Sequence, residues 1–279
     1  MKIAAIAWTT FKESARQRIL YLLLGMGVLL IVIVGQLPMF TFSVLDDVKM
    51  LKDMAVSTMT LVGLLMAIFA AVHVITEEIE NWTVVTVLSK PVRRWEFVTG
   101  KYLGLVTMLA AAYAVMSVIF LLLLWWGMYG HFTEYGNVYP EYVQNFWSDF
   151  AWQTANQMWR GFLLSFFQVV VLAAVAVALC VRLPMVVAVV IYFGVFVTGQ
   201  MMEGALGLAQ QAGPVLQGIT TTLSFLLANL GTFNVAYEVA VEREVIPVSL
   251  IVLSGIYAAM YSGAALLTGV LLFRNREVF

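Results

Sequence analysis

Charge is scarce in this sequence. Asp, Glu, Lys and Arg together make up 11% of its 279 residues, 62% are hydrophobic, and the mean hydropathy is +0.94. So few charges cannot cover the surface of a soluble globular protein of this length. A net charge of -1 and a pI near 6.1 also argue against nucleic-acid partners, which usually need a basic field. The composition therefore predicts an integral membrane protein.

Side chains that commonly carry catalysis are equally scarce. Cys180 is the single cysteine and lies in an apolar run, so no intramolecular disulfide can form. With two histidines, no H-E-x-x-H and no G-x-S-x-G, neither a metal site nor a nucleophile site can be assembled. The nucleotide-binding pattern G-x-x-x-x-G-K-[ST] is missing too, because Trp95 stands where its first glycine would be and Tyr102 follows Gly100 and Lys101. We expect no enzymatic activity and no cofactor on this chain, so any nucleotide must bind elsewhere.

Long runs without charge are present instead. About 20 apolar residues cross the hydrocarbon core as a helix. Runs of at least that length cover 19–45, 54–76, 102–133, 161–181, 183–202 and 245–273. We therefore expect an all-α integral membrane protein with six transmembrane helices in one domain, 1–279.

The distribution of basic residues predicts the topology, since Lys and Arg beside spans favour the cytoplasmic side. The segment 204–237 is uncharged but rich in Gln, Thr and Gly. If it were a seventh span, Arg274 and Arg276 would lie on the extracytoplasmic side. With six spans and both termini cytoplasmic, eleven of the fifteen basic residues lie inside. We expect 204–244 to be an extracytoplasmic or re-entrant segment, tolerated where protein or water satisfies its backbone.

The amino-terminal segment 1–18 has the pattern of a helix lying in the membrane interface. One helical face carries the apolar residues, including Trp8 and Phe11, and the other carries charged and polar ones, including Lys12 and Glu13. A secretory signal is the competing interpretation. The basic head is long for one, it contains Trp8, and no small-x-small cleavage site follows Val34. We expect an interfacial helix that turns sharply near Arg18 into the first span.

Aromatic residues crowd the link 127–160 between the third and fourth spans. Tryptophan and tyrosine rings favour the headgroup zone. We interpret this extracytoplasmic loop as an interfacial anchor rather than as an aromatic cage for a substrate.

Charge concentrates in the link 76–101 between the second and third spans. The second span is expected to continue past His73 as an amphipathic extension, and Pro91 to force Lys90 out of helix. A second short helix would begin at Arg93 and lead into the third span. The segment would then project as a helical hairpin that meets a protein partner; a solvated loop obeying the positive-inside rule fits the composition equally well.

The same link resembles the first cytoplasmic loop of ABC-2 type transporter permeases. The likeness lies in Thr83, the stretch LSKPVRR at 88–94, EFV at 96–98 and GKYLG at 100–104. The in-plane helix with FKES at 11–14, the stretch LLANLGTFN at 226–234 and the ending LFRNR at 272–276 resemble the same family. Ala228 departs from it, since many relatives have proline there.

The resemblance implies a six-span permease of type V exporter-like architecture in the cell inner (plasma) membrane. It implies pairing with a second permease subunit, as homodimer or heterodimer, and docking on two ABC ATPase subunits that carry ATP and Mg, so that hydrolysis drives export. The first loop would couple to the ATPase. Its candidate coupling residues are Glu77, Glu78, Glu80, Trp82, Lys90, Pro91, Arg93, Arg94, Glu96 and Lys101.

Other functions remain open on the residues alone. A self-contained channel or secondary transporter would usually show ionisable residues within its spans, and here His73 near a span end is the single case expected. A structural membrane subunit is a further alternative. Polar residues that could line a translocation path are Gln168, Gln200 and Glu203. Gly100 and Gly104 form a G-x-x-x-G that suits either a close helix contact or a flexible span entry.

Overall fold

A computed structural model describes most of the chain, and its elements are helical throughout the described residues. These residues are 2–36, 44–76, 93–136, 155–212, 218, 220–222, 224, 228–233 and 247–274. The α-helices are α1 (Lys2–Ser14), α2 (Arg18–Gln36), α3 (Val44–Ala71), α6 (Arg94–Gly136), α8 (Asn156–Cys180), α9 (Met185–Ala212) and α12 (Val248–Arg274). A π-helical turn, η1 (Val72–Thr76), follows α3, and a 3₁₀ turn, η3 (Gly231–Phe233), precedes α12. The predicted all-α class is confirmed.

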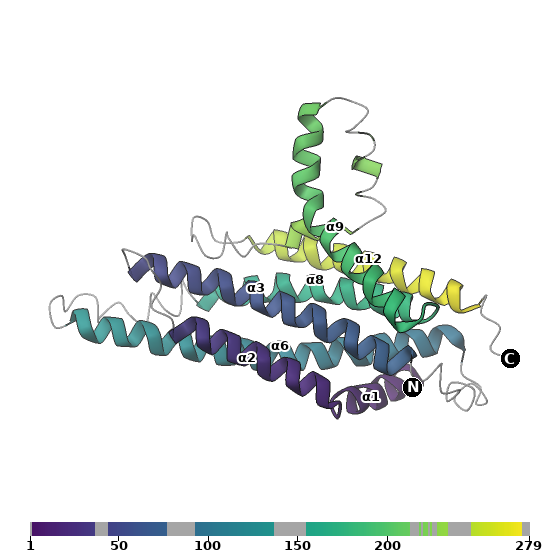
Figure 1. The fold of residues 1–279 in the computed structure, drawn as a ribbon, viewed down its shortest axis with the longest axis horizontal. Coiled ribbons are helices and arrows are strands. Elements are labelled where there is room, and N and C mark those ends of the chain that lie inside the picture. Colours follow the sequence, from purple (N-terminus) through teal and green to yellow (C-terminus); the bar gives the residue numbers. More distant parts are fainter. Residues whose placement is uncertain are drawn as a thin grey trace.

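The long helices from α2 to α12 form an elongated bundle in which successive helices run in opposite directions, and the last part of α9 projects away from it (Figure 1). As a result α1 and the end of α12 lie at the same end of the bundle. Among the described residues, five helices are long and apolar enough to cross a membrane, within α3–η1, α6, α8, α9 and α12, and the bent pair α1 and α2 makes a sixth if it is counted as one span. The described 19 residues of α2 rise about 28 Å, close to the hydrocarbon thickness. The membrane character is confirmed.

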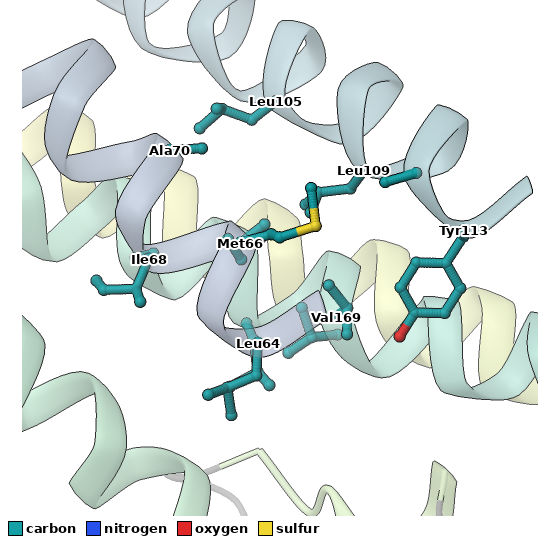
Figure 2. Packing of buried hydrophobic residues seen from close by; sticks show 14 of the residues in the cluster. Leu64, Met66, Ile68, Ala70, Leu105, Leu109, Tyr113 and Val169 are labelled. Carbon is teal, nitrogen blue, oxygen red and sulfur yellow. The ribbon is translucent and has the colours of Figure 1, made fainter. Parts of the chain in front are cut away.

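The core of the bundle lies between α3, α6 and α8. Figure 2 shows side chains from these three helices packed together, among them Leu64, Met66, Leu105, Leu109 and Val169. The spans of α3 and α8 are mostly buried, whereas α9 and α12 remain mostly exposed on the outside. The two buried helices are therefore the scaffold on which the others pack.

Hydroxyl groups join the helices inside this core. The Tyr113 hydroxyl of α6 donates to the carbonyl oxygen of Met59 at 2.9 Å and lies 3.2 Å from the Ser165 hydroxyl of α8. The Ser165 hydroxyl in turn lies 2.7 Å from that of Thr60 on α3. Gly63 allows the tyrosine to approach, because a β-carbon there would come 2.7 Å from the Tyr113 ring. Three helices are thus held in one relative position by a network of buried polar groups.

Three helices are longer than the apolar runs from which the spans were predicted. The expected short helix at Arg93 is the first part of α6, one continuous helix of 43 residues. Helix α6 also continues to Gly136, past the end of its candidate span at Trp126, and α8 begins at Asn156. Helix α9 continues past the end of its candidate span at Met202 to Ala212. Polar and aromatic residues follow the spans in both cases, but they do not by themselves stop a helix.

Residues 228–233 fold back against the two outer helices. The Leu230 N–H donates to the carbonyl oxygen of Gly199 on α9 at 3.1 Å, and the Asn229 N–H donates to the Tyr257 hydroxyl of α12 at 3.0 Å. Gly199 is required here, since a β-carbon would come 2.8 Å from the Ala228 carbonyl oxygen. Ala228 is itself buried, so alanine fits the position at which proline was expected. These hydrogen bonds satisfy backbone groups of the segment and hold it against α9 and α12.

Candidate functional site

Helix α1 lies across the first turns of α6, and two glycines make the close approach possible. A β-carbon on Gly100 would come 2.8 Å from Ile6, and one on Gly104 would come 2.5 Å from the β-carbon of Thr10 and 2.7 Å from the Ala7 carbonyl oxygen. The G-x-x-x-G pair is therefore a close helix contact, as in other membrane helix pairs. A flexible span entry is excluded, because α6 is helical throughout this stretch.

The face of α1 that packs on α6 was not predicted from the sequence. Thr10, Ser14 and Gln17 are buried, while Trp8 is 58% exposed, stacks on Phe11 and lies under the Lys12 ammonium. Ile6, Ala7 and Thr10 face α6, because the two glycines of α6, the glycine seam, leave room for the backbone and side chains of α1. The 68° bend between α1 and α2 agrees with the sharp turn predicted near Arg18.

An ion pair fastens α1 to α6 beside this seam. The Lys101 Nζ lies 3.5 Å from Glu13 Oε2 and 5.6 Å from the centre of the Phe97 ring. The lysine is 5% exposed, whereas the Glu13 side chain is 40% exposed. Lys101 is one of the candidate coupling residues, and its side chain lies between two helices of its own chain.

The start of α6 is capped by Glu96. Its Oε2 accepts the backbone N–H of Arg93 at 2.8 Å, which is half of a capping box and suits the positive end of the helix dipole. Arg93 is exposed. Of the other candidates in this link, Glu77, Glu78, Glu80, Trp82, Lys90 and Pro91 lie outside the described residues, and for Arg94 the structure describes the backbone but not the side chain.

A π-helical turn, η1, ends the second span on the other side of the charged link. It places Val72, Val74 and Ile75 in the core and leaves His73 half-buried, and it packs against α8 and α1. Such turns are rare and recur at functional sites. The sequence predicted an ordinary helix here, and no residue in VHVIT signals the wider turn.

Gln168 and Gln200, two of the three candidates for a translocation path, line the same cavity. It measures about 170 Å³ and lies between α3, α8, α9 and η3. Its polar lining is Ser57, Thr60, Gln168 and Gln200, and its apolar lining is Val56, Leu61, Phe196 and Phe233. Gln168 is 1% exposed and its Nε2 has no hydrogen-bond partner among the described residues. The side chain of Glu203 lies outside the described residues.

An unexpected buried cation, Lys52, lies near the start of the candidate span in α3, at the end opposite η1. Lys52 was expected outside the membrane, yet it is 1% exposed and falls in the first turn of the candidate span Leu51–Thr76. Lys101 falls within a span as well. The expectation that His73 would be the single ionisable residue in the spans was therefore wrong. The sequence did not show that the membrane helices continue through these two lysines.

No grouping of His, Cys, Asp and Glu that could hold a metal occurs within the described part of the chain. No protein-family model and no curated protein matches this chain. The geometry of the α1–α6 contact and of the cavity therefore carries the functional argument.

Proposed function

We propose that this chain is the transmembrane permease subunit of an ATP-driven ABC transporter of the ABC-2 type, acting as an exporter. In this proposal it pairs with a second permease subunit and docks on two ATPase subunits. It lies in the cell inner (plasma) membrane with both termini cytoplasmic. The resemblance of the charged link and of the chain's other motifs to that family motivates the proposal.

The observation that carries it is the joint between α1 and α6. Helix α1 is seated on a glycine seam and fastened by the pair of Glu13 and Lys101, at the point where α6 follows the charged link. A partner that moves the start of α6 would move α1 with it, because both are rigid and closely packed. Rigid-body motion of this kind can turn closure of an ATPase into a tilt of the spans.

The cavity lined by Gln168 and Gln200 supports the second half of the proposal. Uncharged amides and hydroxyls inside a bundle need partners, and a passing substrate can supply them. The cavity borders α9, which is joined to α3 through the Tyr192 hydroxyl and the Leu64 carbonyl oxygen at 3.0 Å. A tilt of α3 would therefore reach the cavity walls.

A self-contained channel or secondary transporter is the second candidate, and the burial of Lys52 favours it. Ionisable residues inside membrane spans often mark ion pathways. Lys52 lies at the end of its span, however, and the cavity residues carry no charge.

Affinity purification from native membranes tests the proposal. The tagged chain should co-purify with an ATPase that carries G-x-x-x-x-G-K-[ST], in a complex of two permease chains and two ATPases. The complex should hydrolyse ATP, and the isolated chain should not. Hydrolysis by the isolated chain would contradict the proposal, and ion flux through it without ATP would favour a channel or secondary transporter.

A further inference from the structure

A shallow groove runs along the outside of the bundle between α6 and α8. It measures about 220 Å³. On the α6 side its wall is a row of small side chains at helical spacing, Ala110, Ala114 and Ser117. Both alanines are exposed, and the Ser117 hydroxyl is already bonded to the Ala114 carbonyl oxygen of its own helix at 3.0 Å. This side of the groove is therefore apolar in effect.

Aromatic rings of α8 form the opposite wall. Trp159, Phe162 and Phe166 line it, again at helical spacing. Two of these rings are held in place by the core. Phe166 packs edge-on against the Tyr113 ring at 5.5 Å, and Phe162 packs in the same way against Phe120 at 5.8 Å. Since the rings are held in place by the core, the groove is a built feature of the fold.

One end of the groove, at Trp159, lies next to the charged residue Arg160 at the start of a candidate membrane span. Trp159 and Arg160 lie in the first turn of the candidate span Met158–Cys180. The Arg160 guanidinium lies 5.7 Å from the centre of the Trp159 ring, and its Nη2 lies 3.5 Å from Asn156 Oδ1. From Trp159 to Phe166 the groove descends about 10 Å along α8, most of the roughly 15 Å that one leaflet occupies.

We propose that this groove binds an acyl chain of an anionic phospholipid, with Arg160 holding the phosphate. A helix with its side chains is about 10 to 12 Å across and cannot be seated in so small a hollow, whereas a single flexible chain can. The guanidinium supplies the charge complementarity, since arginine recognises phosphate oxygens with paired donors. The lipid belongs to the leaflet at the α8 amino-terminal end, away from α1. This inference does not depend on the transport function.

Photo-crosslinking in lipid nanodiscs tests the site. The full-length chain is reconstituted in phosphatidylcholine containing phosphatidylglycerol with a diazirine on one acyl chain, and crosslinked peptides are mapped by mass spectrometry. We expect crosslinks within 110–117 and 159–166. Ala114→Phe fills the groove and should reduce them about fivefold, the effect of losing about 1 kcal/mol of binding. Ala111→Phe places the same ring on an exposed part of α6 outside the groove and should leave them unchanged.

The headgroup is tested separately, with the groove left intact. Arg160→Gln should reduce the preference for phosphatidylglycerol over phosphatidylcholine about fivefold, as expected for one basic residue near the membrane surface. Arg182→Gln, at the other end of α8, should not change it. Equal crosslinking in Ala114→Phe and Ala111→Phe, or an unchanged lipid preference in Arg160→Gln, would overturn the proposal. The absence of lipid crosslinks within 110–117 and 159–166 in the parent chain would overturn it as well.

Discussion

Lys101 Nζ and Glu13 Oε2 lie 3.5 Å apart, although 88 residues separate them in the chain. The pair fixes the angle at which α1 crosses α6, directly beside the glycine seam. A movement of the start of α6 would therefore be transmitted to α1. The predictions below test this joint, the core network, the cavity and the topology.

Breaking the ion pair should loosen α1. Glu13→Gln leaves a buried lysine without its carboxylate, so we expect the free energy of unfolding in detergent to fall by about 1 kcal/mol. Lys12→Gln is the matched control, because Lys12 is exposed on the same helix and contacts the Trp8 ring. Equal losses in the two variants would show that the pair contributes nothing specific.

Filling the glycine seam should displace α1. A β-carbon on Gly104 meets Thr10 at 2.5 Å, and overpacking of this kind costs about 1 to 3 kcal/mol. We expect Gly104→Ala to increase maleimide labelling of Thr10→Cys, which is buried in the parent. Gly25→Ala is the control, since a β-carbon there meets nothing within 4 Å. Unchanged labelling in Gly104→Ala would contradict the close packing of α1.

Ser165 should stabilise the core more than an equally small hydroxyl on the outside. Its hydroxyl joins α3, α6 and α8, and interhelical hydrogen bonds in membranes contribute about 0.6 kcal/mol on average and up to about 1.7. We expect Ser165→Ala to destabilise the protein within that range. Ser117→Ala removes a bond within one helix and should have a smaller effect. Chemical denaturation in detergent compares the two, and the reverse order would contradict the network.

The charge distribution and the bundle together predict the topology. In a chain with Cys180 replaced by Ala, cysteines at Arg182 and Asn275 should react with an impermeant maleimide only from the cytoplasmic side, and one at exposed Thr232 only from outside. Labelling of Asn275→Cys from outside alone would refute the six-span topology and the charge argument behind it.

Much of this fold could be predicted from the sequence, because hydrophobic length and charge placement depend on local composition. The membrane helices and the sharp turn near Arg18 follow from these patterns. The extent of α6 and α9 did not, since polar residues end a helix only when a capping group or a proline stops it. The burial of Lys52 and Lys101 depends on neighbours far away in the chain, which periodicity cannot reveal.

The candidate site could likewise be predicted from the sequence only in part. Gln168 and Gln200 were selected as isolated polar residues in apolar runs, and the structure brings them to one cavity through the packing of α8 and α9. The face of α1 that packs on α6 was missed, because hydrophobicity predicts an apolar face whereas the contact is determined by Gly100 and Gly104 on the other helix. The π-helical turn at 72–76 has no signal in its residues.

The cavity should matter for transport and little for folding. Gln168→Leu and Gln200→Leu keep the side chains similar in size while removing the amides, so we expect both proteins to assemble but to lose substrate-stimulated ATP hydrolysis in reconstituted vesicles. Thr198→Val on α9 is the control, because the Thr198 hydroxyl bonds to its own helix on an exposed face. Full substrate stimulation of ATP hydrolysis in both glutamine variants would show that the cavity is not part of the translocation path.

Crosslinking at Arg93 tests the central claim most directly. Arg93→Cys, at the exposed start of α6, is treated in native membranes with a short thiol-to-amine crosslinker, and the products are identified by mass spectrometry. We predict a crosslink to an ATPase that carries G-x-x-x-x-G-K-[ST], weakened when Arg94→Glu reverses the neighbouring charge, and no such crosslink from Thr232→Cys at the other end of the bundle. The absence of any ATPase crosslink from Arg93→Cys, in membranes where the chain is inserted and folded, would contradict the account.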